Sequence, residues 1–206
     1  MISSKEISQI LLDIKAVHLN PTNYFTWTSG IKSPIYCDNR KIISHHEYRT
    51  QITKAFADHI QTFHKEVEVI AGTATAGIPW ASWIAQELKL PLVYVRSGAK
   101  AHGLKNQVEG SLSPQQKVIL IEDLISTGKS SIEAAQAITG SGAEVLSIIS
   151  IFSYDFESIP QIFKKAGYNY TSLTNLNSLL TVAEGQSIIT KAQVEEIKTW
   201  KKTITL

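Results

Sequence analysis

Residues 118–131 read VILIEDLISTGKSS. The four apolar residues at the start predict a buried parallel strand, because a strand covered on both faces shows no polar alternation. Glu122 and Asp123 follow, then a loop of small residues at 126–130 and a helical stretch over 132–138. Open α/β sheets bind ligands at the carboxyl ends of their strands, and a helix N-terminus favours an anion. The stretch therefore predicts a phosphate site beside two carboxylates.

Three interpretations of this stretch compete. The two acids could cap an ordinary strand-to-helix turn. Gly128, Lys129 and Ser130 also match the end of a Walker A nucleotide loop, but Asp123 stands where that loop requires its first glycine. A carboxylate at that position would lie against a polyphosphate of the same charge, which argues against a Walker A loop. A sugar phosphate fits better, because carboxylates accept hydrogen bonds from vicinal hydroxyls while the loop amides hold the phosphate.

Composition restricts the class of protein. The chain has 206 residues, 43% of them hydrophobic, which is enough for one domain with a full core. A formal net charge of +2 gives no field that favours nucleic acid or a membrane surface. The single cysteine, Cys37, predicts a reducing compartment, and the amphipathic segment 1–17 is not a secretory signal. We expect a cytoplasmic protein.

Strand and helix patterns alternate along the chain, which predicts a mainly parallel sheet with helical crossovers. The predicted strands are 67–71, 92–95, 118–121 and 145–152, and the predicted helices are 47–63, 78–88, 130–138 and 159–166. The loops after the first three strands would open on the same edge of the sheet.

Two of these loops have compositions that suit a diphosphate. Residues 72–77, GTATAG, carry little side chain and would let backbone amides approach a ligand, although a plain tight turn has the same composition. Residues 96–110 contain three spaced glycines and no regular periodicity, which predicts either a mobile lid or a solvated basic loop. A closed lid would bring positive charge onto a leaving group. The cations of this segment are Arg96, Lys100, His102 and Lys105.

The motifs together resemble one family. Residues 122–130 match the 5-phosphoribosyl diphosphate (PRPP) motif of type I phosphoribosyltransferases, and residues 25–40, FTWTSGIKSPIYCDNR, resemble the N-terminal hood of orotate phosphoribosyltransferases. GTATAGIP and VRSGAKAHG follow at family-like distances, so the resemblance extends from about residue 7 to 201. It implies an α/β fold of the type I phosphoribosyltransferase kind: a single domain, 1–206, with a central mainly parallel sheet flanked by helices. The small hood subdomain would comprise about residues 1–40 and the C-terminal segment.

The resemblance also implies a reaction. PRPP and orotate would give orotidine 5′-monophosphate and pyrophosphate, with Mg²⁺ required, in de novo pyrimidine synthesis. Because Mg²⁺ binds through substrate phosphates and retains waters, we expect no dedicated protein cage for it. The family further implies a homodimer in which the lid of one subunit covers the active site of the other.

Site residues follow position by position from the matched motifs. The implied catalytic residues are Lys100, His102 and Asp123, and the implied orotate contacts are Ser126 and Tyr36. The implied PRPP contacts are Arg96, Lys100, His102, Glu122, Asp123, Leu124, Ile125, Ser126, Thr127, Gly128, Lys129 and Ser130. Some branches of the family carry cations where this chain has Thr28, Ala76, Ser97 and residues 153–154, so no role is transferred to those positions.

Two other classes stay open at this point. A purine-base phosphoribosyltransferase would share the PRPP motif but would have no reason to carry the hood segment. A non-catalytic regulator of the same fold would bind a nucleotide and control RNA, for which a basic face is expected and a net charge of +2 gives no indication.

Overall fold

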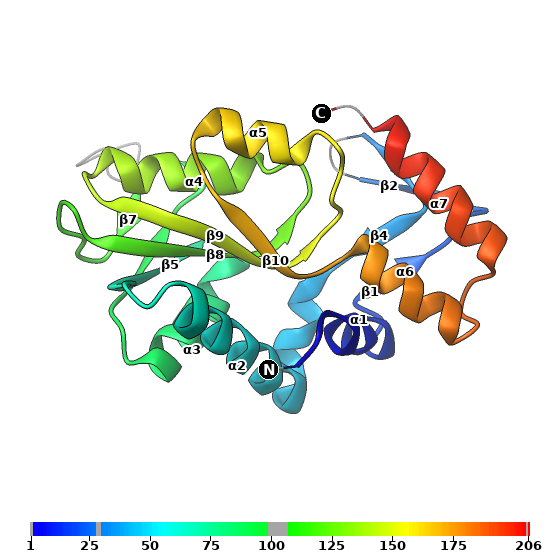
Figure 1. The fold of residues 1–206 in the computed structure, drawn as a ribbon, viewed down its shortest axis with the longest axis horizontal. Helices are drawn as coiled ribbons and strands as arrows, with labels where there is room; N and C mark the ends of the chain where they lie inside the picture. Colours follow the sequence, from blue (N-terminus) through cyan, green and yellow to red (C-terminus); the bar gives the residue numbers. More distant parts are fainter. Residues whose placement is uncertain (1, 28–29, 99–106, 205) are drawn as a thin grey trace.

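A six-stranded sheet forms the centre of the computed structural model, which describes residues 2–27, 30–98, 107–204 and 206 (Figure 1). Five strands run parallel and β7 is antiparallel at one edge, which confirms the predicted mainly parallel sheet. In spatial order the strands are β10 (Tyr170–Asn175), β9 (Glu144–Ser153), β8 (Lys117–Ile125), β5 (Val69–Thr73), β6 (Leu92–Val95) and β7 (Val108–Glu109).

Helices cover both faces of the sheet. Figure 1 shows α2 (His46–Phe63) and α3 (Gly77–Leu88) on one face, with α4 (Lys129–Gly140) and α5 (Ile159–Ala166) on the other. The apolar strand 118–121 is fully buried between these layers, as its uninterrupted hydrophobic run predicts. Within residues 2–27, 30–98 and 107–204, no helix is long and apolar enough to cross a membrane.

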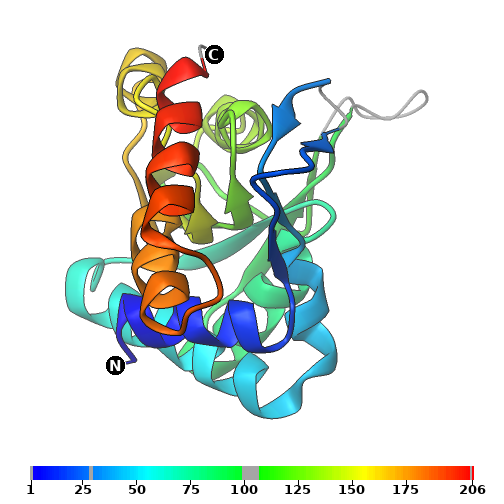
Figure 2. The ribbon, with the colours of Figure 1, turned by 90° about the vertical axis from the view of Figure 1, so that its right-hand side faces the viewer.

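Short strands near the N-terminus form the hood. β1 (Val17–Leu19) pairs antiparallel with β4 (Ile35–Cys37), and β2 (Phe25–Thr26) with β3 (Lys32–Ser33); the 3₁₀ helix η1 (Asn39–Ser44) follows. Figure 2 shows these strands rising on the opposite side of the view from the C-terminal helices α6 (Leu176–Gly185) and α7 (Lys191–Thr203). Trp200 of α7 joins the two parts, because its indole N–H donates to the Lys32 carbonyl over 2.9 Å.

The predicted amphipathic N-terminal helix is α1 (Ser4–Asp13). It begins with a capping box, in which the Ser3 hydroxyl accepts from the Glu6 amide and the Glu6 carboxylate accepts from the Ser3 amide. Its buried Ser8 hydroxyl hydrogen-bonds Thr174 of β10 over 2.6 Å. The bond between Ser8 and Thr174 holds the helix against edge strand β10.

One predicted strand ends later than the sequence indicates, and the difference matters for the site. The sequence predicts a strand at 118–121, and β8 contains these residues but continues to Ile125, so Glu122 and Asp123 lie within a strand. The reason is β9, which runs to Ser153 and pairs with the extra residues, Glu122 with Ser150 and Leu124 with Phe152. The carboxylates are therefore fixed by the sheet.

Candidate active site

Glu122 faces α4. It is 5% exposed, and its carboxylate accepts hydrogen bonds from the hydroxyls of Ser131 (3.2 Å) and Ser130 (3.5 Å) and from the Asp123 amide (3.1 Å). Burial raises the pKa of Glu122 well above its ordinary value of 4.5, and the adjacent Asp123 charge raises it further. Glu122 therefore retains a proton more readily than an exposed glutamate.

Asp123 follows Glu122 in β8, and the two carboxyl groups lie within hydrogen-bonding reach of each other. Burial raises its pKa as well, while the positive charge of Arg40 acts in the opposite direction. Since two adjacent carboxylates are costly to ionise together, the proton of the pair is held chiefly by the more buried Glu122. The hydrogen bond with Glu122 and the positive charge of Arg40 both favour the ionised form of Asp123.

Asn39 fixes the end of β8 from the hood side. Its side chain is 1% exposed, and its amide nitrogen donates to the Asp123 carbonyl over 2.6 Å. The Asn39 carbonyl oxygen accepts from the Cys37 thiol at 3.2 Å. Sequence reasoning missed Asn39, although it lies inside the hood segment that carries the family resemblance.

The segment 126–130 leads into α4, which begins one residue before the predicted start, at Lys129. Gly128 has φ +76°, and a Cβ there would lie 2.5 Å from the Phe163 ring, so the loop requires glycine at this position. The first N–H groups of a helix have no intrahelical acceptors. The structure thus brings together Ser126, Thr127, Gly128, Lys129 and Ser130 near Asp123 at the start of a helix, an arrangement that favours an anion.

Residues 73–76 connect β5 to α3. They belong to the segment whose composition is predicted to suit a diphosphate, and they are here called the pyrophosphate loop. A Cβ at Gly77 would collide with the Ile121 carbonyl, so glycine allows α3 to begin directly against β8. The Thr73 hydroxyl is buried and has no hydrogen-bond partner among the described residues. It lines a small cavity of about 40 Å³ together with Arg96 and Ser130. This cavity connects the pyrophosphate loop, the base of the predicted lid and the start of α4.

Arg96 lies just after β6, with Nη1 3.5 Å from a carboxylate oxygen of Glu109. The other predicted lid cations, Lys100, His102 and Lys105, lie outside the described residues, as does Thr28. Their predicted roles are therefore untested by this geometry.

A larger cleft of about 530 Å³, the hood cleft, opens between the hood and the end of β8. It contains the two predicted orotate contacts, Tyr36 and Ser126. Sequence reasoning did not assign Arg40 or Tyr154 to it. Its lining residues are Thr26, Trp27, Tyr36, Cys37, Arg40, Leu124, Ser126, Thr127 and Tyr154.

The walls of the hood cleft are mostly aromatic and neutral. Trp27 packs on Tyr154 with ring centroids 4.7 Å apart, and burial raises the pKa of both Tyr154 and Cys37 well above their ordinary values. Neither group carries charge near neutral pH. Tyr36 is 38% exposed and presents a ring at the edge. Such a cleft suits a flat ring with polar groups at its periphery.

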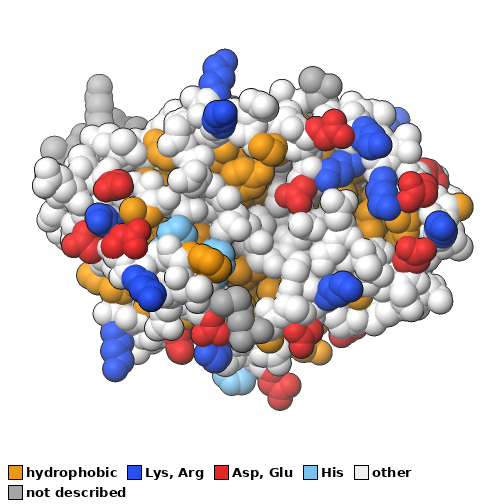
Figure 3. Space-filling model, in the orientation of Figure 1, with side chains coloured by type: hydrophobic (Ala, Val, Ile, Leu, Met, Phe, Trp, Pro, Cys, Tyr) orange, Lys and Arg blue, Asp and Glu red, His pale blue; other side chains and the backbone are white. Residues whose placement is uncertain are grey.

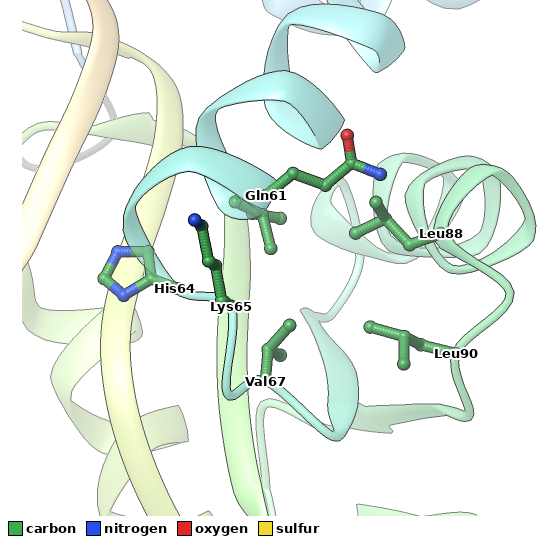
Figure 4. Close-up of a pocket in the computed structure, with 7 residues that line it drawn as sticks. Gln61, His64, Lys65, Val67, Leu88 and Leu90 are labelled. Atoms are coloured by element: carbon green, nitrogen blue, oxygen red, sulfur yellow. The ribbon is translucent and has the colours of Figure 1, made fainter.

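Figure 4 shows a second pocket, of about 240 Å³, lined by Gln61, His64, Lys65, Val67, Leu88, Leu90 and Ile60. Val67 and Leu90 precede β5 and β6, so this pocket lies at the amino ends of the strands. Parallel sheets bind their ligands at the carboxyl ends, where the hood cleft is. The hood cleft is therefore the better candidate.

Comparison with known proteins identifies the family. Residues 39–167 match the phosphoribosyl transferase domain family. Orotate phosphoribosyltransferase of Listeria monocytogenes serotype 4b (strain F2365) is 49% identical over 198 residues, which cover 96% of this chain and 95% of that protein. The chain belongs to the orotate phosphoribosyltransferase family. The protein of the same name from Lactococcus lactis subsp. cremoris (strain SK11) is also 49% identical, over 97% of this chain and 95% of that protein.

Solved structures of this family share the fold. UMP synthase of Leishmania donovani superposes with a TM-score of 0.84 and 28% identity over 98% of this chain, which spans 43% of that longer protein. Orotate phosphoribosyltransferase from Aeropyrum pernix, at 24% identity and a TM-score of 0.72, covers 89% of this chain and 99% of its own and supports the fold alone. The predicted family, fold class and enzyme class, a phosphoribosyltransferase of pyrimidine synthesis, are thereby confirmed.

Proposed function

We propose that this chain transfers the 5-phosphoribosyl group from PRPP to orotate, forming orotidine 5′-monophosphate and pyrophosphate. The proposal rests on one observation, that the loop before α4 and the hood cleft share two residues. Ser126 and Thr127 belong to the anion-binding loop before α4 and also line the hood cleft. A phosphoribosyl group bound at the loop would therefore meet a flat base bound in the cleft.

The PRPP half of the site lies around the end of β8. The 5-phosphate binds the amides at the start of α4, and the ribose hydroxyls donate to Asp123. Loss of pyrophosphate leaves a positively charged, oxocarbenium-like ribose, which the Asp123 carboxylate stabilises. The leaving group lies over the pyrophosphate loop, where the Thr73 hydroxyl is free to donate and Arg96 adds charge. Lys100 and His102 complete this task when the lid closes.

The acceptor half is the hood cleft. Orotate stacks against Tyr36, and the Ser126 hydroxyl hydrogen-bonds a polar group of its ring. Because orotate arrives as an anion, the site needs no strong general base. Its main tasks are to orient the ring nitrogen toward the ribose and to exclude water from the positively charged centre.

Mg²⁺ is proposed to arrive with the diphosphate. The residues present fit this ion, because Asp123 offers a hard oxygen donor close to where the diphosphate would lie, and Mg²⁺ otherwise coordinates phosphate oxygens and water. Among the described ranges, no three His, Cys, Asp or Glu side chains gather into a metal cage. When bound, Mg²⁺ neutralises charge on the leaving group.

The assembly and location of the enzyme are also proposals. We infer a cytoplasmic homodimer in which the lid of each subunit covers the partner's site. The family resemblance supports this arrangement, as does the length of the glycine-spaced segment 98–110. The single thiol, Cys37, supports a reducing compartment.

An acceptor comparison tests the reaction. Purified chain, PRPP and Mg²⁺ are mixed with orotate, adenine, hypoxanthine or xanthine, and loss of each base is followed spectrophotometrically. Orotate should be consumed and the purines should not. Consumption of a purine instead would support the alternative base specificity, and no consumption of any base would support the regulator.

A further inference from the structure

If orotate is the acceptor, the hood cleft must bind a carboxylate. Orotate carries a carboxylate at the edge of its ring, and a carboxylate removed from water needs charge-assisted donors. Among the described residues that line the cleft, Arg40 is the one cation. The remainder are aromatic or aliphatic side chains, hydroxyls and the protonated Cys37 thiol.

Asp38 holds one edge of the Arg40 guanidinium. Its Nε donates to an Asp38 carboxylate oxygen over 2.6 Å, and its backbone amide donates to the same oxygen over 3.3 Å. A guanidinium has five N–H donors in a rigid fork. Within the described part of the chain neither Nη nitrogen of Arg40 has a hydrogen-bond partner, so the outer pair of donors is available for a planar, bidentate contact.

Exposure and charge favour a ligand at these donors. The Arg40 side chain is 63% exposed, so a small molecule can reach it, while the bond to Asp38 keeps its orientation. The hydrogen bond from Arg40 lowers the pKa of Asp38, so the anchoring carboxylate stays ionised. The positive charge of Arg40 also lowers the pKa of Asp123, so the guanidinium lies near the carboxylate that is proposed to bind the ribose.

We propose that Arg40 binds the carboxylate of the acceptor through its Nη nitrogens and thereby makes the enzyme select orotate over neutral pyrimidines. Asp38 is a positioning residue that orients the guanidinium. This inference rests on the proposed function, because it assumes a carboxylated pyrimidine in the cleft.

The test is Arg40→Gln, assayed with orotate and with orotamide, the neutral amide of orotate, as a competing inhibitor. Loss of a charge-assisted contact should raise KM for orotate roughly tenfold to a hundredfold. KM for PRPP and the inhibition constant of orotamide should stay within about twofold, since the rest of the site is intact. Arg40→Lys keeps the charge without the fork and should recover part of the loss.

Lys41→Gln is the matched control. It removes the same charge from the next residue, whose ammonium donates to the Lys15 carbonyl over 2.8 Å and does not line the cleft. It should leave KM for orotate within about twofold of wild type.

The inference and the proposed function fail in different ways. If wild type consumes orotate and folded Arg40→Gln keeps its KM for orotate, or if KM for PRPP rises instead, the assignment of Arg40 is overturned and the function stands. A parallel loss of orotamide binding would also overturn it, by showing that Arg40 only maintains the shape of the cleft. A wild type that does not use orotate overturns both.

Discussion

Glu122 and Asp123 are neighbours in sequence and interact with each other, but their other contacts differ. Glu122 is enclosed by the hydroxyls at the start of α4, whereas Asp123 faces the charged residues of the hood. The sequence predicted both carboxylates at the site, because they are contiguous with the loop that follows. It could not predict Asn39 beside them, because that contact joins residues 84 positions apart.

Because Glu122 holds its proton more tightly in the folded state, the free energy of unfolding depends on pH. In the unfolded chain Glu122 loses its proton near 4.5, whereas the folded chain keeps it to higher pH. The folded state then binds more protons, so this residue's contribution to the free energy of unfolding falls as pH rises. Glu122→Gln should therefore gain urea resistance relative to wild type as pH rises above the ordinary glutamate pKa of 4.5. Glu133→Gln, an exposed change on α4, should show no such trend.

Asp123 should matter for PRPP more than for folding. Asp123→Asn removes the charge that faces the ribose but keeps a side chain of the same shape. We expect kcat/KM for PRPP to fall at least tenfold, with a melting temperature within roughly 4 °C of wild type, equivalent to about 1 kcal/mol. Equal losses of PRPP use and thermal stability would show that this carboxylate is structural.

At the scale of elements, the sequence predicted the helices and strands that have a clear hydrophobic periodicity. β6 and α5 have the predicted bounds, and the other six predicted elements overlap the observed ones. β10, YTSLTN, was missed because its Ser, Thr and Asn residues hide the alternation of an edge strand. The hood strands are only two or three residues long, too short to give a pattern.

The junction of α3 and β8 depends on Gly77. An added Cβ would meet the Ile121 backbone, which cannot move aside as a side chain can. Gly77→Ala should destabilise the protein by about 1–3 kcal/mol and weaken PRPP binding, because the pyrophosphate loop would shift. Urea unfolding and KM for PRPP measure the two effects. Gly185→Ala, where a Cβ meets nothing within 4 Å, should leave KM for PRPP unchanged and should not destabilise the protein. A Gly77→Ala variant with unchanged stability would refute the close packing.

At the scale of the whole molecule, the site combines distant segments. The hood supplies Tyr36 and Arg40, the central sheet supplies Asp123, and α7 closes the hood through Trp200. Sequence reasoning identified the parts carried by contiguous motifs and missed Tyr154, which only folding brings to the cleft. Arg40 lies at the end of the hood segment 25–40, but the sequence alone assigned it no role. Figure 3 shows acidic and basic side chains interspersed on one face, where a regulator of RNA would be expected to present a basic stripe.

The proposed shared lid predicts complementation between subunits. Lys100→Ala and Asp123→Asn homodimers should each be nearly inactive, because each lacks one member of every site. Re-associating the two should give about half mixed dimers, each with one intact site, and so about a quarter of wild-type activity. Verified mixed dimers without activity would mean that each lid serves its own subunit or that Lys100 has no role.

The stoichiometry of the reaction tests the central claim most directly, because that claim joins a PRPP loop and an orotate cleft in one site. Orotate loss and pyrophosphate release are measured together for purified chain with PRPP, with and without Mg²⁺. We predict one pyrophosphate for each orotate consumed, formation of orotidine 5′-monophosphate, and neither change without Mg²⁺. Pyrophosphate release that does not depend on orotate, or no consumption of orotate at all, would contradict the account.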